Sequence, residues 1–193
     1  MKRLVLWSIS LLGVLLLAYQ LFPSEEPSGT LTPFTSPLSS PRALPSLPVS
    51  LSETPATLTI IPVTHHIGNR SFPSWGYNGQ IPGPLLTVRK GSNHTIVVTN
   101  TMPYETTVHW HGLRLENQFD GVPDVTQKPI VPKESFTYHL TFPDAGIFWY
   151  HPHIREDYQQ ESGLYGMIHV IDETSPNYYP VVLDDIALDA EGT

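Results

Sequence analysis

The sequence predicts an all-β protein, a Greek-key sandwich or barrel of short strands, and three observations lead to this fold class. Beyond Thr57 the chain consists of short runs rich in β-branched and aromatic residues. Turn-forming residues separate these runs at close intervals, as at Tyr77-Asn78-Gly79 and Asp120-Gly121. No helical period of apolar residues lies between them. Many short strands at this spacing are typical of β-sandwiches and β-barrels.

An apolar segment opens the chain. Leu4–Phe22 contains no charged residue, is 19 residues long and follows Lys2 and Arg3. This length suits a transmembrane helix. A cleaved signal peptide is the alternative, although no small-x-small cleavage site stands out. Residues 1–22 are therefore predicted to be a membrane anchor or signal segment, and the two basic residues place the rest of the chain outside the cytoplasm.

Residues 23–56 form a second compositional zone, rich in Pro, Ser and Thr. It contains eight prolines, from Pro23 to Pro55. Because proline lacks a backbone donor and favours extended conformations, this zone is predicted to be a linker.

The folded region is expected to span residues 57–173. It has the size of one β-sandwich domain. The candidate strands, in chain order, are Leu58–Val63, Leu85–Arg89, Thr95–Thr99, Thr107–His111, Ser135–Phe142, Gly146–His151, Leu164–Ile171 and Val181–Asp185. A helical turn or two is expected around Arg155–Glu161, where the acidic run of Glu156, Asp157 and Glu161 is interpreted as a solvated helix face.

Composition excludes several classes of function. Eighteen acidic residues against ten Lys and Arg give a formal net charge of -8, which argues against a nucleic-acid partner. The chain contains no Cys, and this excludes disulfides, thiolate nucleophiles and Cys-ligated blue-copper sites from it. Nine His remain, so metal chemistry depends on imidazole, carboxylate or backbone ligands.

Two His-x-His pairs are the strongest functional signal: His109 with His111, and His151 with His153. Residues i and i+2 of an extended strand project to the same face, roughly 7 Å apart. Each pair is therefore suited to binding two different ions of a cluster, and two pairs on neighbouring strands bring four imidazoles to one patch. Imidazole suits copper, zinc, iron and nickel, so the ligand type alone leaves the metal open. A single pair is more often structural, whereas two in one small domain predict a metal site.

The residues around these pairs carry a resemblance. His-Trp-His-Gly at 109–112, Asp-Gly-Val-Pro at 120–123, and Gly-Ile-Phe-Trp-Tyr-His-Pro-His at 146–153 resemble the amino-terminal cupredoxin domain of the multicopper oxidases, the laccase-like enzymes. Residues 77–84 and 88–92 resemble the early strands of that family. The resemblance covers most of the folded region and implies a cupredoxin-like fold for residues 57–173.

The resemblance also implies roles for the histidines. His109 corresponds to a ligand of the type 2 copper, and His111, His151 and His153 to ligands of the type 3 copper pair. The family's trinuclear cluster takes eight histidines, of which this chain supplies four. The others, and the Cys of the type 1 copper, belong to a carboxy-terminal cupredoxin domain. Residues 174–193 resemble a linker and the start of a second such domain, so the chain is expected to be the front part of a longer enzyme.

Asp120 matches a family acid beside the cluster that helps to deliver protons during dioxygen reduction. An Asp-Gly turn residue is the simpler interpretation, and the two are compatible. The other five histidines fall in no matching motif and are expected to be packed or exposed residues without a ligand role: His65, His66, His94, His139 and His169.

The implied function is that of a copper oxidoreductase, which reduces dioxygen to water with electrons from a phenolic or metal-ion substrate. The isolated chain is expected to be inactive, because half of the cluster and the electron-entry site are missing from it. Two alternatives stay open: a copper-binding module without catalysis, and a half-enzyme completed by a partner chain. Copper nitrite reductase shares the fold but needs a type 1 Cys in its first domain.

Overall fold

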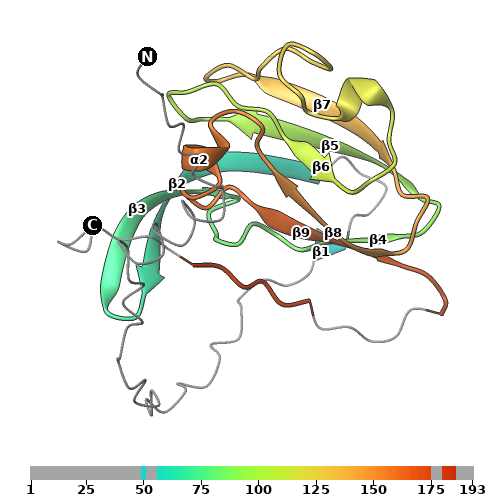
Figure 1. Ribbon diagram of the computed structural model, residues 1–193, viewed down its shortest axis with the longest axis horizontal. Coiled ribbons are helices and arrows are strands. Elements are labelled where there is room, and N and C mark those ends of the chain that lie inside the picture. The colour runs from blue at the N-terminus through green and yellow to red at the C-terminus, as the bar shows by residue number, and fades with distance from the viewer. Residues whose placement is uncertain (1–48, 51–55, 175–179, 186–193) are drawn as a thin grey trace, which may run out of the picture. The chain divides into compact units, whose positions relative to one another are not determined.

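The computed structural model describes residues 49–50, 56–174 and 180–185, and these form two β-sheets (Figure 1). The strands of the first sheet, in spatial order, are β1 (Val49–Ser50), β4 (Leu86–Arg89), β9 (Gly166–Ile171), β8 (Gly146–His151) and β6 (His109–His111). Those of the second sheet are β3 (Arg70–Tyr77), β2 (Ala56–Ile67), β5 (Asn93–Asn100) and β7 (Ser135–Thr141). The predicted all-β class is confirmed.

The core lies between the two sheets, as expected for a sandwich. Alternate residues of β5, among them Ile96 and Val98, are fully buried, while their neighbours are only partly covered. Val88, Ile168 and Val170 supply buried side chains from the opposing sheet. The sheets are therefore held together by the period-two pattern that the sequence displays.

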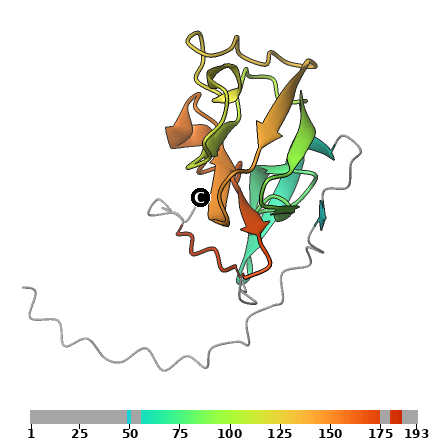
Figure 2. The same cartoon turned by 90° about the vertical axis from the view of Figure 1, so that its right-hand side faces the viewer.

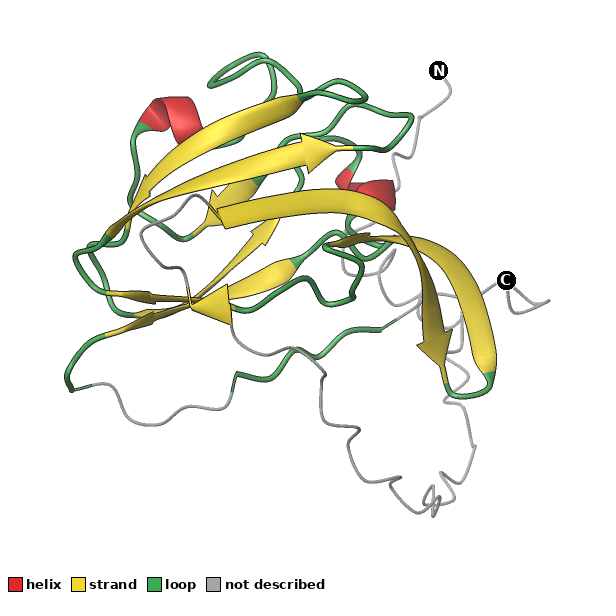
Figure 3. Cartoon of the chain, turned by 180° about the vertical axis from the view of Figure 1, so that it is seen from behind, coloured by secondary structure: helices red, strands yellow, loops and turns green. Residues whose placement is uncertain are grey.

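Strand β3 is absent from the predicted strands, and β2 runs four residues beyond the predicted end at Val63. The two form a hairpin that curves away from the rest of the sheet (Figure 3). Pro73 is tolerated because β3 is an edge strand, and Pro62 because β2 pairs with β5 only from Ala56 to Ile60.

The strand expected at Val181–Asp185 is not formed, since residues 180–185 are loop. A strand needs a hydrogen-bonded neighbour, and in the described part of the chain none pairs with this segment. The Tyr165 hydroxyl instead donates a hydrogen bond to the carboxylate of Asp184, a residue of this segment. Strand β1 falls inside the range predicted as linker and pairs in parallel with β4.

Helical structure is limited to two short elements in the described residues, η1 (Asn117–Phe119) and α2 (Glu156–Gln159). The helical turn expected at Arg155–Glu161 is thus confirmed. In Figure 2 the turn containing α2 (orange) lies on the same side of the molecule as β6 (yellow-green). No helix within the described ranges has the length and apolar character to span a membrane. The predicted anchor Leu4–Phe22 lies outside those ranges.

Candidate metal centre

The first histidine pair lies on β6, at the edge of the five-stranded sheet, and the second begins with His151, the last residue of the adjacent antiparallel strand β8, so that His153 follows the strand end. The register of β6 and β8 sets His109 opposite His151, and His111 opposite Trp149. One ring nitrogen of each of His109, His151 and His153 lies within 4.8 Å of the others. The predicted convergence of the pairs is therefore present in the fold.

His111 joins this group through His151. Its Nδ1 lies 3.3 Å from Nε2 of His151. Two nitrogens bound to one ion at about 2.0–2.1 Å, the distance for zinc and imidazole, stand about 3.3 Å apart at a tetrahedral angle. The spacing therefore fits one metal ion held between the two rings.

Backbone carbonyls orient two of the imidazoles. Nδ1 of His109 lies 2.7 Å from the Asp120 carbonyl oxygen, and Nδ1 of His151 lies 3.0 Å from that of Pro152. A carbonyl oxygen only accepts, so both rings carry their proton on Nδ1 and keep the Nε2 lone pair for a metal. Metal-binding histidines are commonly fixed in this way.

Asp120 contacts His109 through both its backbone and its side chain. The carboxylate Oδ1 lies 3.3 Å from Nδ1 of His109, farther than the backbone carbonyl. The main-chain contact is therefore the hydrogen bond that orients the ring, and the carboxylate stays partly open to solvent. A hollow of about 640 Å³, lined by Asp120, Leu113, Thr141 and Pro143 among others, adjoins this carboxylate.

Gly121 allows the turn after Asp120 to lie directly against β6. It adopts φ +79°, and a Cβ on it would lie 2.1 Å from the Val108 carbonyl oxygen. Only glycine fits at such a close approach in this conformation. Asp120 and Gly121 therefore form a turn, and this turn also holds the Asp120 carbonyl against the His109 ring.

Aromatic side chains pack on both faces of the sheet at the histidine strands. Trp149 stacks on His151, with ring centroids 4.0 Å apart and planes 19° apart. Trp110, between the two histidines of β6, turns to the opposite face and is fully buried against Tyr138 and Tyr150. This alternation matches the predicted strand geometry and holds both strands on the core.

The electrostatics of the cluster favour neutral imidazoles. The pKa of His151 is lowered to about 4, chiefly by burial and also by the nearby His109, His153 and His111, against the opposing effect of the Pro152 carbonyl. Burial and the neighbouring His109 also lower the pKa of His153. A neutral ring is the form that binds a metal, so at pH 7 neither ring has to lose a proton first.

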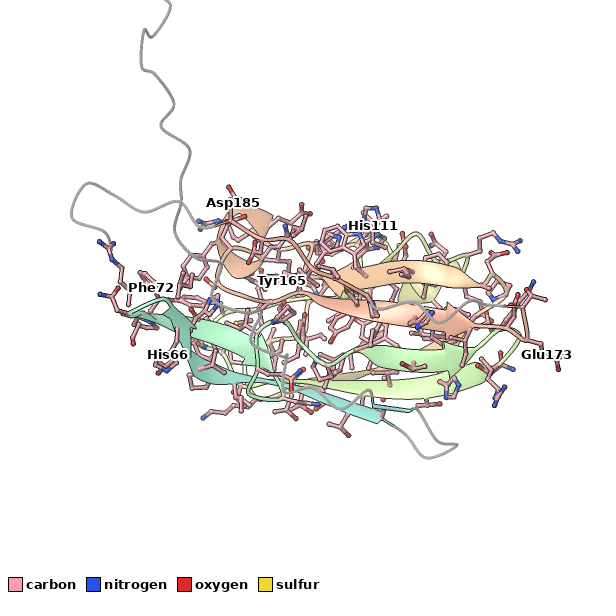
Figure 4. The ribbon with its side chains drawn as sticks, turned by 90° about the horizontal axis from the view of Figure 1, so that it is seen from below. His66, Phe72, His111, Tyr165, Glu173 and Asp185 are labelled. Carbon is pink, nitrogen blue, oxygen red and sulfur yellow. The ribbon has the colours of Figure 1, made fainter. Side chains whose placement is uncertain are left out.

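Sequence reasoning assigned no site role to Glu156, whose Oε1 lies 3.9 Å from Nε2 of His153. Glu156 is the first residue of α2, three residues after His153. Three histidines outside the motifs have other partners: His66 with Ser71, His94 with Ser92, and His139 with Thr95. Figure 4 shows His111 on the outer side of the five-stranded sheet and His66 at the distant hairpin.

Comparison with known proteins settles the family. A sequence model described as multicopper oxidase matches residues 62–175, more than half of the chain. The chain belongs to the multicopper oxidase family. It is 38% identical over 134 residues to multicopper oxidase MmcO of Mycobacterium tuberculosis, covering 67% of this chain and 26% of that protein. It is also 43% identical over 114 residues to Laccase-2 of Thanatephorus cucumeris, covering 54% and 19%.

Solved structures agree with this family. The chain matches the crystal structure of a multicopper oxidase from Pseudomonas thermotolerans with a TM-score of 0.62 and 38% identity, over 67% of this chain and 32% of that one. Fet3p, described as a multicopper oxidase that functions in iron import, matches with a TM-score of 0.58 and 34% identity, over 66% and 25%. The chain spans about a quarter or less of the first curated relatives it matches.

Proposed function

We propose that this chain is the copper-binding, amino-terminal cupredoxin domain of a multicopper oxidase. It supplies four histidines to a trinuclear copper site at which dioxygen is reduced to water. The electrons come from one-electron oxidation of a phenolic or metal-ion substrate. The observation that carries the proposal is the convergence of His109, His151 and His153, with His111 beside His151.

The place of the cluster on the sheet supports a shared site. Strand β6 is an edge strand, and His111 on it is exposed. Four imidazoles at an edge are accessible to further ligands from a second domain or from a partner chain. We assign His109 to the type 2 copper and the other three histidines to the type 3 pair. Because the sequence has no Cys, the type 1 copper and electron entry belong to that second unit.

The chain's own residues prepare and serve the site. Bound copper supplies the one-electron redox chemistry that imidazole lacks. The carbonyls of Asp120 and Pro152 hold two rings in the metal-binding tautomer. The Asp120 carboxylate, beside His109 and partly open to solvent, holds and passes protons that dioxygen reduction consumes. Trp149 covers one side of His151 and excludes water there.

Location follows from the same proposal. We place the domain outside the cytoplasm, attached to the membrane if Leu4–Phe22 remains uncleaved, or secreted if it is removed. A copper-binding module without catalysis is the alternative function. The edge position of β6 favours the shared site, because a self-contained site needs no exposed ligand.

Copper titration of the purified chain tests the proposal. Wild type is expected to bind copper, His109→Ala and His151→Ala to lose affinity by at least about tenfold, and His139→Ala to retain it. His139 is a matched control, since it is an exposed strand histidine paired with Thr95. Equal affinity in all variants contradicts the assignment. Oxidation of a phenolic dye by the chain alone contradicts the shared site.

A further inference from the structure

His153 is the one cluster histidine that no strand positions. His109 and His111 lie on β6, and His151 is the last residue of β8, so the ladder between these strands places the other three. His153 comes after the end of β8. Its ring nevertheless packs against the ring of His109, with centroids 4.2 Å apart and planes 31° apart. A contact outside the sheet therefore has to place His153.

The Thr107 hydroxyl makes such a contact. Its Oγ1 accepts a hydrogen bond from the backbone N–H of His153 at 3.3 Å. Thr107 is fully buried and shortly precedes His109, the first residue of β6. The bond therefore joins the segment that leads into the first histidine pair to the last histidine of the second pair. It holds the backbone of His153, and the side chain then has a small set of rotamers to adopt from that fixed point.

The chain beyond His153 is held to the same segment by Gln159, the last residue of α2. Gln159 is buried, and its side-chain carbonyl accepts a hydrogen bond from the Thr106 hydroxyl at 2.7 Å. Its amide donates to the Glu105 carbonyl at 2.9 Å. This agrees with the position of α2 on the same side of the molecule as β6 (Figure 2). Residues 105–107 thus hold the chain after β8 at two points, one of them His153 itself.

The ring of His153 lacks the support that its neighbours have. His109 and His151 each donate Nδ1 to a carbonyl oxygen. Within the described residues, no hydrogen bond engages the ring of His153. The Glu156 carboxylate lies 3.9 Å from its Nε2, which is beyond hydrogen-bond distance. The backbone bond to Thr107 is therefore the polar contact that orients His153.

We propose that Thr107 is a positioning residue of the metal centre, and that its hydroxyl sets the place of His153 against His109. This inference rests on the proposed function, in which the histidines bind copper. Thr107 is not itself a ligand in this proposal, because it acts through the backbone of His153. Groups that hold a metal ligand in place typically change metal affinity about 10- to 100-fold when they are removed.

Three variants of the full 193-residue chain, purified in detergent, test this inference. Thr107→Val removes the hydroxyl at nearly constant size, and Thr107→Ser keeps a hydroxyl at the same position. Thr101→Val is the control, because it removes a threonine hydroxyl that is bonded to a backbone carbonyl elsewhere, that of Ile60 in β2. Each is titrated with Cu(II) against a competing chelator, and its Cu(II) electron paramagnetic resonance spectrum is recorded. In the metal-free chain, nuclear magnetic resonance follows hydrogen exchange of the His153 amide.

Thr107→Val is expected to bind Cu(II) at least about tenfold more weakly than wild type, with altered copper hyperfine splitting and faster exchange of the His153 amide. Thr107→Ser and Thr101→Val are expected to match wild type. Folded Thr107→Val with wild-type affinity and spectrum overturns the inference. Thr107→Ser that binds as weakly as Thr107→Val also overturns it, because packing rather than the hydroxyl then accounts for the effect.

The exchange measurement decides the case in which Thr107→Val does not fold. A His153 amide that is protected in the wild-type chain supports the inference, and one that exchanges freely overturns it. Wild type that binds no copper overturns the proposed function itself, while amide exchange still tests the bond to Thr107. The two failures are therefore distinguishable.

Discussion

Replacing Gly121 by alanine tests whether the turn after Asp120 sets the position of His109. The new Cβ would lie 2.1 Å from the Val108 carbonyl oxygen, whereas ordinary contact begins at 3.4 Å. The turn therefore has to retreat by about 1.3 Å, which is enough to break the 2.7 Å hydrogen bond from His109 to the Asp120 carbonyl. The expected result is lower stability together with weaker copper binding.

Gly91→Ala is a matched control for backbone strain. Gly91 has φ +80°, nearly the φ +79° of Gly121, but a Cβ on Gly91 would meet nothing within 4 Å. We expect Gly91→Ala to cost about 1–2 kcal/mol, from the left-handed conformation alone. Gly121→Ala should cost about 3–5 kcal/mol, because overpacking and a lost hydrogen bond add to the strain.

Urea unfolding of both variants measures these costs, and copper titration measures the site. Copper affinity is expected to fall about 10- to 100-fold in Gly121→Ala and to stay unchanged in Gly91→Ala. The reasoning is refuted if the two variants unfold within about 0.5 kcal/mol of each other and bind copper equally. Loss of stability without loss of affinity would show that the Asp120 carbonyl does not orient His109.

Three further predictions concern other parts of the site. The folded pKa of His151, about 4, lies below its ordinary value of 6.5, so the unfolded chain binds more protons between these pH values. The metal-free domain should therefore lose up to about 3 kcal/mol as pH falls from 6.5 to 4, and a urea midpoint that stays constant over this range contradicts the shift. Asp120→Asn keeps the backbone contact to His109, so copper affinity should stay within about threefold of wild type. Dioxygen reduction in a complete enzyme should slow by about 100-fold or more, and unchanged turnover removes the proton role. Gln159→Ala breaks one buried and one partly buried hydrogen bond and should cost about 2–3 kcal/mol in urea unfolding, against little for the neighbouring Gln160→Ala.

The sequence predicted those parts of the fold that depend on local patterns. Short runs of β-branched and aromatic residues between turn signals indicated most strands, and the two His-x-His pairs indicated a shared patch. The strand predicted at Leu58–Val63 covers the first half of β2, Pro62 included, but the end of β2 and the whole of β3, with Pro73, were not predicted. Whether a proline lies at a sheet edge depends on which strands become neighbours, and no local pattern contains that information.

The sequence was sufficient to predict which residue type binds the metal. It was not sufficient to predict which atoms of those residues contact one another. Spacing predicted that His109 and His111 share one face. It did not predict that Nδ1 of His111 lies against Nε2 of His151, since the register of two strands 40 residues apart decides this. Glu156 was interpreted as part of a solvated helix face, and its side chain is 54% exposed in α2, as expected, although the left-handed turn at Arg155 that precedes it is invisible in the sequence.

The groups that orient the histidines are backbone atoms more than side chains. The carbonyls of Asp120 and Pro152 fix the tautomers of two rings, and any residue could supply a carbonyl at those positions. The sequence has to place the backbone so that these carbonyls face the rings. Here that placement depends on the close approach of Gly121 to β6. Copper affinity should therefore respond more to substitutions that move this turn than to those that change the Asp120 carboxylate. Asp120→Asn and Gly121→Ala, adjacent in sequence, are the direct comparison.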